Sequence, residues 1–309
     1  MADDRDLAAM LLRIEKSSIY DGEGLRTVVF LKGCNLRCLW CSTPESQNGG
    51  LEMGFDAVRC RDCGACTDAC PGEALLRGYD GRLAIAEERC RHCLRCRDIC
   101  PYGALFYYGR KVSVHEVLDE ILKDEVFYFH SGGGVTVSGG EPLLQADFVA
   151  ELLKRCKAHG VNTALETSFA VPWDRAAKVL PYLDTLFVDL KHSNSATHEL
   201  LTGLKNDAVL ANIILADHTA GSFEIIMRLP LIPGLNDDEL NLRKTAALAA
   251  SLNKLKYLQV LPYHRLGSGT YAKLGREYAL RDLPTPSPAY MAQKCSLIKM
   301  YQPTLQVKC

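Results

Sequence analysis

The sequence predicts an α/β fold, an open, partial (β/α)6 TIM-type barrel into which a small cysteine-rich domain is inserted. Outside a cysteine-rich stretch, short apolar runs alternate with segments of helical periodicity, and this alternation is typical of a parallel sheet with helices outside it. About six such runs occur, too few for a closed eight-stranded barrel. Eleven of the fourteen cysteines fall between Cys34 and Cys100, so the inserted domain interrupts the barrel early.

The predicted strands are short apolar runs with β-branched residues. In chain order they lie at residues 28–31, 135–138, 161–165, 185–189, 224–229 and 258–261. A helix is predicted to begin at Pro142 and run to about residue 157, because leucines and valines recur there at helical spacing. Two further helices are predicted to begin at capping boxes, Ser113 with Glu116 and Asn236 with Glu239.

The composition is that of an ordinary globular chain. Of 309 residues, 48% are hydrophobic and 24% charged, and 36 Lys and Arg against 37 Asp and Glu give a net charge of −1. Because no basic surplus is available to neutralise phosphates, nucleic acid is not expected as a partner. No apolar run reaches the roughly 18 residues of a membrane span, and the acidic beginning is unlike a signal peptide. We therefore expect a cytoplasmic protein with no membrane contact.

The segment between about residues 51 and 110 contains an internal repeat. The run CRDCGACTDACPGEAL, from Cys60, is echoed 30 residues later by CRHCLRCRDICPYGAL, from Cys90. Each copy has the C-x2-C-x2-C-x3-C-P spacing of bacterial ferredoxins, in which three cysteines hold one 4Fe-4S cluster and the fourth holds the cluster of the other copy. In a reducing compartment, clustered thiols of this kind more often bind metal than form disulfides.

This spacing predicts two auxiliary clusters that exchange their fourth ligands. A pair of zinc sites is the alternative, but zinc sites rarely need this eight-thiolate pattern. The predicted domains are residues 1–50 and 111–309 for the barrel and residues 51–110 for the bacterial-ferredoxin-like insert. The predicted ligands are Cys60, Cys63, Cys66 and Cys100 for one cluster, and Cys90, Cys93, Cys96 and Cys70 for the other.

Three further cysteines lie upstream of the insert in CNLRCLWC, namely Cys34, Cys38 and Cys41, and no fourth Cys or His follows close behind. A cluster held by three thiolates keeps one iron position open for a ligand from solution, as catalytic metal sites generally do. A structural zinc site completed by a distant Cys or His is the alternative. Trp40, between the last two cysteines, either covers the cluster or packs beside a cofactor ring.

The C-x3-C-x2-C motif with an aromatic residue before its last cysteine resembles the radical S-adenosylmethionine (SAM) superfamily, in which the amino and carboxylate groups of methionine fill the open iron position. SSIYDGEGLRTVVFLKGC, SGGGVTVSGGEPLLQ, LETS, VDLK, MRLPLIPGLND and LPYHRLG resemble, in family order, the activating enzymes of glycyl radical enzymes. The insert matches the subgroup with two auxiliary clusters. Glu23 stands where the family usually has Pro, and Thr43 where it often has Asn.

The resemblance implies a set of SAM-binding residues. The glycine turn after the second predicted strand would receive the methionine amino group, and Lys191, which shares one side of a strand end with Asp189, would reach the carboxylate or ribose. Glu166 and Thr167 would hold a monovalent cation, although the family more often has Asp at the position of Glu166. A plain turn, a surface ion pair and a structural histidine are the alternatives. The remaining residues are Gly139, Gly140 and Glu141 for the amino group, Glu166 and Thr167 for the cation, Arg228 for the carboxylate and His264 for the ribose.

The loop before the first predicted strand contains Asp21, Gly22 and Arg26. In the family this loop faces the incoming glycine peptide, so the resemblance implies that these residues and Lys191 serve catalysis. A solvated turn capped by Asp21 is the alternative. Three cysteines match no motif, and one of them, Cys156, is expected to be buried in a helix. The other two are Cys295 and Cys309.

The resemblance also implies a reaction. SAM is cleaved reductively to methionine and a 5'-deoxyadenosyl radical, which takes a Cα hydrogen from a glycine of a partner glycyl radical enzyme. A ferredoxin or flavodoxin would supply electrons, and the auxiliary clusters would relay them or serve structure or docking. We expect a monomer. Two other interpretations stay open: a three-cluster electron carrier, which the open cysteine group and the GGE segment disfavour, and a radical SAM enzyme with another substrate, which DGEGLR disfavours.

Overall fold

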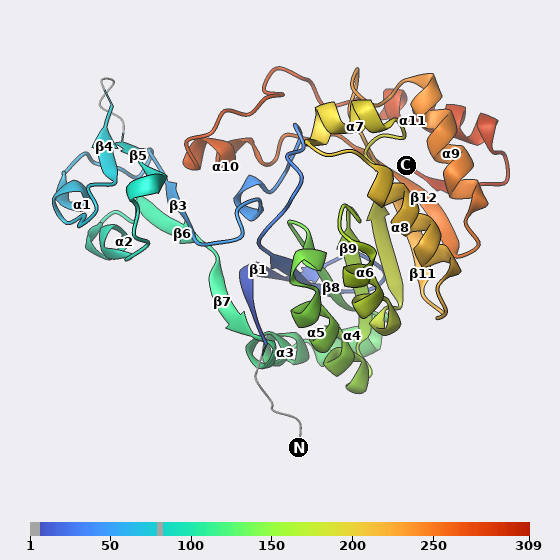
Figure 1. Ribbon diagram of the computed structural model, residues 1–309, viewed down its shortest axis with the longest axis horizontal. Coiled ribbons are helices and arrows are strands. Elements are labelled where there is room, and N and C mark those ends of the chain that lie inside the picture. The colour runs from blue at the N-terminus through green and yellow to red at the C-terminus, as the bar shows by residue number, and fades with distance from the viewer. Residues whose placement is uncertain (1–6, 79–82) are drawn as a thin grey trace.

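The computed structural model describes residues 7–78 and 83–309, and its largest part is an open barrel of parallel strands with helices outside (Figure 1). Within these residues, nine strands form one sheet in the order β13-β12-β11-β10-β9-β8-β2-β1-β7. All six predicted strands are present, and they pair in parallel with one another, which confirms the partial barrel. They are β2 (Arg26–Leu31), β8 (Gly134–Gly139), β9 (Asn162–Thr167), β10 (Thr185–Asp189), β11 (Glu224–Leu231) and β12 (Leu255–Pro262).

Three strands of this sheet are absent from the sequence prediction. β1 (Ala8–Ser18) runs antiparallel to β2 on one side and to β7 (Arg110–Ser113) on the other. β13 (Val307–Lys308) pairs in parallel with β12 at the opposite edge. β1 joins the barrel to the strand that returns from the insert, so both ends of the insert connect to the main sheet.

Helices cover the outer face of the sheet and bury their apolar sides against it. In α5 the side chains of Val149, Leu152, Leu153 and Cys156 recur at helical spacing, and all four are fully buried. The expected burial of Cys156 is therefore confirmed. The helices of the barrel are α3 (Val114–Leu122), α4 (Glu125–Ser131), α5 (Ala146–Ala158), α6 (Trp173–Val179), α7 (Ser195–Thr202), α8 (Asp207–His218), α9 (Glu239–Ser251), α10 (Ser268–Lys273) and α11 (Pro288–Tyr301).

Helix starts test the capping predictions directly. The capping box of Ser113 with Glu116 is present at the start of α3. The box predicted at Asn236 is wrong, because Asp238 caps α9 by accepting a hydrogen bond from the backbone N–H of Asn241. Asn236 is engaged elsewhere, as described below. Pro142 opens a short 3-10 helix (Pro142–Gln145), and the α-helix begins only after it.

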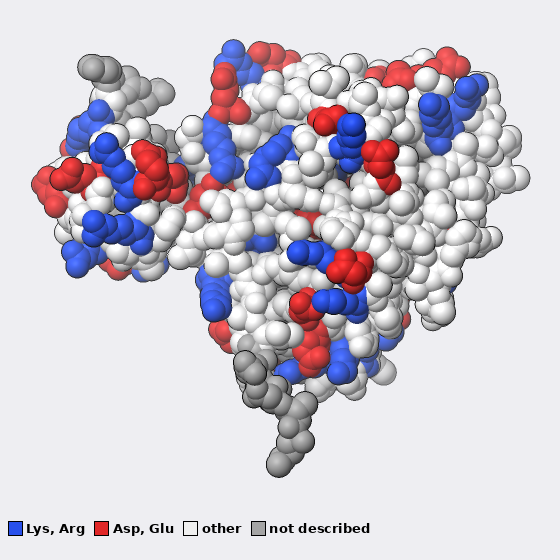
Figure 2. Space-filling view, viewed as in Figure 1, with Lys and Arg blue, Asp and Glu red and all other residues white. Residues whose placement is uncertain are grey.

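The insert projects from the barrel as a separate lobe, drawn in cyan at the left of Figure 1. It contains two antiparallel ribbons, β3 (Glu52–Phe55) with β6 (Leu105–Tyr108) and β4 (Leu75–Arg77) with β5 (Leu83–Ile85), and two short helices, α1 (Ala65–Asp68) and α2 (Arg95–Ile99). Its small core includes Met53, Leu75, Cys96 and Leu105. On the face shown in Figure 2, basic and acidic side chains interleave over this lobe.

The chain end is tied to the last helix by a disulfide. Cys295 of α11 and Cys309 are joined, with their Cα atoms 6.5 Å apart. Their spacing in the sequence matches no motif, so only the folded chain shows this pairing. Among the described residues, no helix is both long and apolar enough to cross a membrane.

Candidate active site

A large open cavity lies at the carboxyl ends of the parallel strands. Side chains that leave the ends of neighbouring parallel strands meet at one rim, and barrel active sites occupy this rim. The cavity therefore collects residues that are far apart in the sequence. The predicted site residues that line it are Asp21, Cys34, Cys38, Trp40, Cys41, Gly139, Gly140, Glu166, Thr167, Asp189, Lys191, Arg228 and His264.

The cysteines of CNLRCLWC lie on the loop that follows β2. Backbone hydrogen bonds from Arg37 to Thr202 O, at 2.6 Å, and from Leu39 to Leu201 O, at 3.1 Å, hold this loop against the end of α7. Burial raises the pKa of Cys34 to about 12 and that of Cys38 to about 11, with the Lys191 ammonium opposing the rise at Cys38. Buried thiolates need a compensating cation, and a cluster iron supplies one.

The arrangement of these thiols suits an iron–sulfur cluster. Within the described residues, no three His, Cys, Asp or Glu side chains converge as a ligand set for one metal ion. A four-iron cluster binds one thiolate on each iron, so its ligands need not meet at one point. Cys34, Cys38 and Cys41 all face the same cavity. The residues present therefore fit a cluster with three protein ligands.

Two ion pairs line the inner face of the sheet. Lys191 Nζ lies 2.8 Å from Asp189 Oδ2, and Arg228 pairs with Glu166, whose other oxygen accepts a 2.6 Å hydrogen bond from Ser138. Burial opposes the charge of Lys191, but Asp189 and the nearby thiols together raise the pKa of its ammonium. The cavity thus keeps two buried cations beside the cysteine loop.

Comparison with known proteins identifies this constellation. Residues 86–246 match the Radical SAM superfamily, and residues 52–104 match the 4Fe-4S dicluster domain. The (2S)-3-sulfopropanediol dehydratase activating enzyme of Klebsiella oxytoca is 42% identical over 280 residues, which are 89% of this chain and 88% of that protein. The chain belongs to the activating enzymes of glycyl radical enzymes, within the radical SAM superfamily.

Two further comparisons agree with this family. The isethionate sulfite-lyase activating enzyme of Desulfovibrio desulfuricans is 41% identical and covers 89% of each chain. A radical SAM methyltransferase from Sphaerobacter thermophilus shares the fold, with a TM-score of 0.51 and 15% identity over 97% of this chain and 76% of that one. The resemblance, the fold class and the type of enzyme expected from the sequence are therefore confirmed.

In this activating enzyme the glycine turn after β8 is packed too tightly for side chains. Gly139 has φ of +120°, and a Cβ there would lie 2.2 Å from Leu31 O. A Cβ on Gly140 would lie 2.2 Å from Gly33 O, on the loop that leads to Cys34. Close contact with β2 at Gly139, and with the loop after β2 at Gly140, therefore requires glycine at both positions.

Glu141 is not among the residues that line the cavity. Its carboxylate is fully buried and accepts hydrogen bonds from Leu143 N, Thr167 Oγ1, Ser168 N and Ser168 Oγ at 2.6–3.1 Å. These bonds join the turn after β8 to the end of β9. The structure therefore places Glu141 behind the cavity wall. There it supports Gly139 and Gly140, which do line the cavity.

The three residues expected to face the glycine peptide, Asp21, Gly22 and Arg26, do not share one environment in the structure. Asp21 lines the cavity, and its backbone oxygen accepts a 2.7 Å hydrogen bond from Thr136. Arg26 is 2% exposed and donates to Thr136 Oγ1, Asn162 Oδ1 and Val135 O at 2.6–2.9 Å. A Cβ at Gly22 would lie 2.6 Å from Arg26 Cδ. Arg26 therefore supports the loop from within the barrel and does not reach the cavity.

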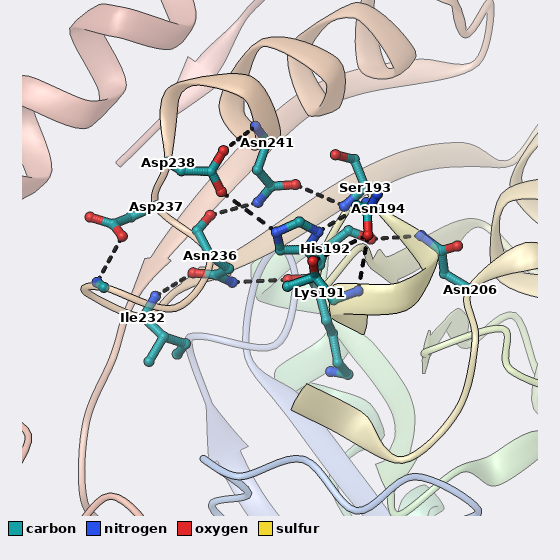
Figure 3. A network of polar contacts seen from close by, with 12 residues as sticks. Lys191, His192, Ser193, Asn194, Asn206, Ile232, Asn236, Asp237, Asp238 and Asn241 are labelled. Carbon is teal, nitrogen blue, oxygen red and sulfur yellow. Dashed lines mark hydrogen bonds and ion pairs between the residues drawn. The ribbon is translucent and has the colours of Figure 1, made fainter. Parts of the chain in front are cut away.

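A buried polar network fixes the backbone around Lys191, and the sequence analysis missed it (Figure 3). Asn236, which is fully buried, donates to Lys191 O at 2.9 Å and Pro230 O at 2.7 Å and accepts from Ile232 N at 2.7 Å. Asn241 donates to Asn236 O. The network joins the loops that follow β10 and β11, so it sets where the Lys191 side chain enters the cavity. The PGLND stretch was its only sequence signal.

Replacing Asn236 with alanine is expected to destabilise the enzyme and weaken SAM binding. The change leaves two carbonyls and one N–H without partners in the interior, and each such group costs about 1–3 kcal/mol. Chemical denaturation measures the loss, and calorimetry measures SAM affinity. The control is Asn253→Ala, which removes an amide from an exposed loop bonded to Asp217. Equal stabilities of the two variants would refute the proposed importance of the network.

Two smaller cavities in the insert contain its eight cysteines in two groups of four. One is lined by Cys60, Cys63, Cys66 and Cys100. The other is lined by Cys70, Cys90, Cys93 and Cys96. These are the two ligand sets that the repeat spacing predicts, including the exchange of the fourth cysteine. Both groups therefore fit a 4Fe-4S cluster.

The remaining cavity residues form its outer wall. Trp40 packs with an apolar group that includes Leu201, Ile232 and Tyr263, and it is 8% exposed. His264 lies on the loop after β12 at the rim of the cavity. The structure therefore permits both roles considered for Trp40, because its ring covers the cysteine loop and also faces the cavity.

Proposed function

We propose that this activating enzyme binds three 4Fe-4S clusters and SAM, and that it generates a radical at the Cα of a glycine in a partner glycyl radical enzyme. The observation that carries the proposal is the cavity itself, which brings three thiols, two buried cations and Asp21 together at one rim. A cluster on the first cysteine loop supplies, when bound, the electron that cleaves the sulfonium of SAM. Homologous chains named as activating enzymes support the assignment.

The side chains of the cavity bind and orient SAM in this proposal. Lys191, held by Asp189 at 2.8 Å, faces the methionine carboxylate or the ribose, and Arg228 supplies the second cation. The glycine turn leaves its backbone accessible to the amino group, and His264 lies at the ribose end. The apolar wall around Trp40 excludes water from the reacting atoms. No residue of the chain acts as a general acid or base.

A monovalent cation is not part of the proposed site. Glu166 is already neutralised by Arg228 and accepts from Ser138, and the Thr167 hydroxyl donates to Glu141 at 2.7 Å. Both residues expected to hold the cation are therefore committed to protein partners. We further propose residues 1–50 and 111–309 as the barrel and 51–110 as the insert, a monomer in the cytoplasm, and a ferredoxin or flavodoxin as electron donor.

The function is tested with the anaerobically reconstituted protein, SAM, a chemical reductant and a candidate partner glycyl radical enzyme. We expect 5'-deoxyadenosine and, in the partner, the electron paramagnetic resonance (EPR) signal of a glycyl radical. 5'-Deoxyadenosine without a partner radical would favour another substrate. Absence of SAM binding, with clusters confirmed by iron analysis, would favour an electron carrier.

Asp21→Asn separates partner recognition from SAM cleavage. Asp21 lines the cavity from the DGEG loop, so we propose that its carboxylate faces the glycine peptide. A hydrogen bond to a charged group contributes about 1.5–3 kcal/mol, and its loss is expected to lower the yield of partner radical by about 10–100-fold. SAM cleavage without a partner should remain at the wild-type rate. Parallel loss of both activities would contradict this role.

A further inference from the structure

The two cysteine sites of the insert lie at different distances from the first cysteine loop. The base of the β3–β6 ribbon is the Glu52–Tyr108 pair, where Glu52 contacts Arg276 and lies 3.6 Å from Lys32. The other end of the ribbon contacts α10, where Asp56 lies 3.3 Å from Lys273. The cavity of Cys70, Cys90, Cys93 and Cys96, called here the inner site, is lined by Met53 and Tyr107 of the next pair.

The cavity of Cys60, Cys63, Cys66 and Cys100, called here the outer site, lies farther along the same ribbon. It is lined by Phe55 and Leu105, which form the last pair of the ribbon. Two residues of strand correspond to about 7 Å. Figure 1 agrees, because α1, which carries Cys66, is at the tip of the lobe.

A chain of polar contacts connects the base of the ribbon with the first cysteine loop. Arg276 pairs with Glu52, and it also lies 3.4 Å from Gln47 Oε1. The Gln47 backbone carbonyl in turn accepts a 3.1 Å hydrogen bond from Cys34 N on the first cysteine loop. The inner site therefore adjoins the part of the insert that contacts the SAM-site loop, and the outer site is farther from it.

The internal repeat makes the two sites comparable residue by residue, and two of the positions at which they differ lie beside ligand sulfurs at the inner site. At the inner site the Tyr107 hydroxyl lies 3.6 Å from Cys96 Sγ, and His92 Nδ1 lies 3.9 Å from Cys90 Sγ. Thirty residues earlier, Arg77 and Asp62 occupy the equivalent positions and form an ion pair with each other. Tyr107 thus places a hydroxyl donor beside a cluster ligand of the inner site. At the equivalent position of the outer site stands Arg77, which has no hydroxyl.

We infer that the hydrogen bond from the Tyr107 hydroxyl gives a cluster bound at the inner site a higher reduction potential than one bound at the outer site. Electron transfer within the insert is then directed toward the first cysteine loop. A hydrogen bond to a ligating sulfur favours the reduced cluster, which carries one more negative charge. With clusters bound at both sites, one electron from a low-potential donor of the ferredoxin or flavodoxin class would be held preferentially at the inner site, with no bond made and no proton moved. This inference rests on the proposed three-cluster enzyme.

The test measures potentials on the holoenzyme by EPR at controlled potentials in Tyr107→Phe and wild type. We expect the inner site of the wild type to be reduced at the higher potential. In Tyr107→Phe, the ratio of reduced to oxidised inner cluster at a given potential should fall about tenfold, which is about 59 mV for one electron. Cys63→Ser assigns the outer signal, because an oxygen ligand changes the spectrum of that cluster alone.

Tyr108→Phe is the matched control. It removes a hydroxyl from the next residue of β6, whose ring packs against Phe106 on the other face of the ribbon, and both potentials should stay unchanged. An inner potential that is unaffected by Tyr107→Phe, or that lies below the outer one in wild type, would overturn the inference. Failure of the three-cluster proposal is a different result, because iron analysis would then show fewer clusters before any potential is measured.

Discussion

Cys38→Ala is expected to abolish 5'-deoxyadenosine formation from SAM. Cys38 lines the SAM cavity with Cys34 and Cys41, and two remaining thiolates do not hold a cluster that needs three. Removal of one member of a unit that acts together generally costs nearly as much activity as removal of the whole unit. Iron content should fall from about 12 to about 8 atoms per chain, because the two insert clusters persist.

The control for this experiment is Cys156→Ala. Cys156 is fully buried in α5 and belongs to the hydrophobic core, outside all three cysteine sites. This variant should keep its iron and its SAM cleavage, with at most a modest loss of stability from the small cavity. Substantial 5'-deoxyadenosine from Cys38→Ala would place radical generation outside the first cysteine loop and would falsify the proposed site.

Arg228→Ala is expected to be the most destabilising substitution in the cavity wall. Arg228 pairs with Glu166, donates to Gln259 at 3.0 Å and stacks 4.0 Å above the Phe187 ring. Its removal leaves the Glu166 carboxylate buried without a cation, and such a loss typically costs about 3–5 kcal/mol. Chemical denaturation of the anaerobic holoenzyme measures this loss, and SAM affinity should fall with it.

The loss of folding stability caused by Arg228→Ala should increase as the pH rises. Burial raises the pKa of Glu166 above its ordinary value of 4.5, and Arg228 opposes that rise. Without Arg228, the Glu166 carboxyl of the folded protein stays protonated to a still higher pH, whereas that of the unfolded chain loses its proton near the ordinary pKa. Stability then falls as pH rises from about 4.5 through the folded-state pKa. The difference between wild type and variant should therefore widen from about pH 5 to pH 8.

A surface ion pair supplies the control for this prediction. Arg281 and Glu277 lie 3.1 Å apart, with side chains 69% and 80% exposed. Exposed pairs of this kind contribute between about 0 and 1 kcal/mol, so Arg281→Ala should leave stability nearly unchanged at every pH. If Arg228→Ala behaves in the same way, Glu166 is solvated in the folded protein and the proposed charge balance of the cavity is wrong.

The central strands and the cysteine groups were predictable because each depends on local sequence. A buried parallel strand is a continuous apolar run, as in β10, and a cluster motif is a set of thiols at short, repeated spacing. β1 was missed because its apolar run is short, is interrupted at Arg13, and is followed mainly by charged and polar residues. β13 was missed because its two residues are too few to carry a periodic signal.

The family, the barrel and the eleven cysteines proposed as cluster ligands follow from the sequence alone. Which polar residues share the cavity with these cysteines depends on how the chain folds. Arg26, Glu141 and Asn236 look in the sequence like residues of a functional motif, but the fold buries each one with protein partners. Tyr107 belongs to no motif, yet β6 places it beside Cys96. The reason is physical: spacing along the chain specifies local ligand sets, whereas burial and hydrogen-bond partners depend on strands that meet only after folding.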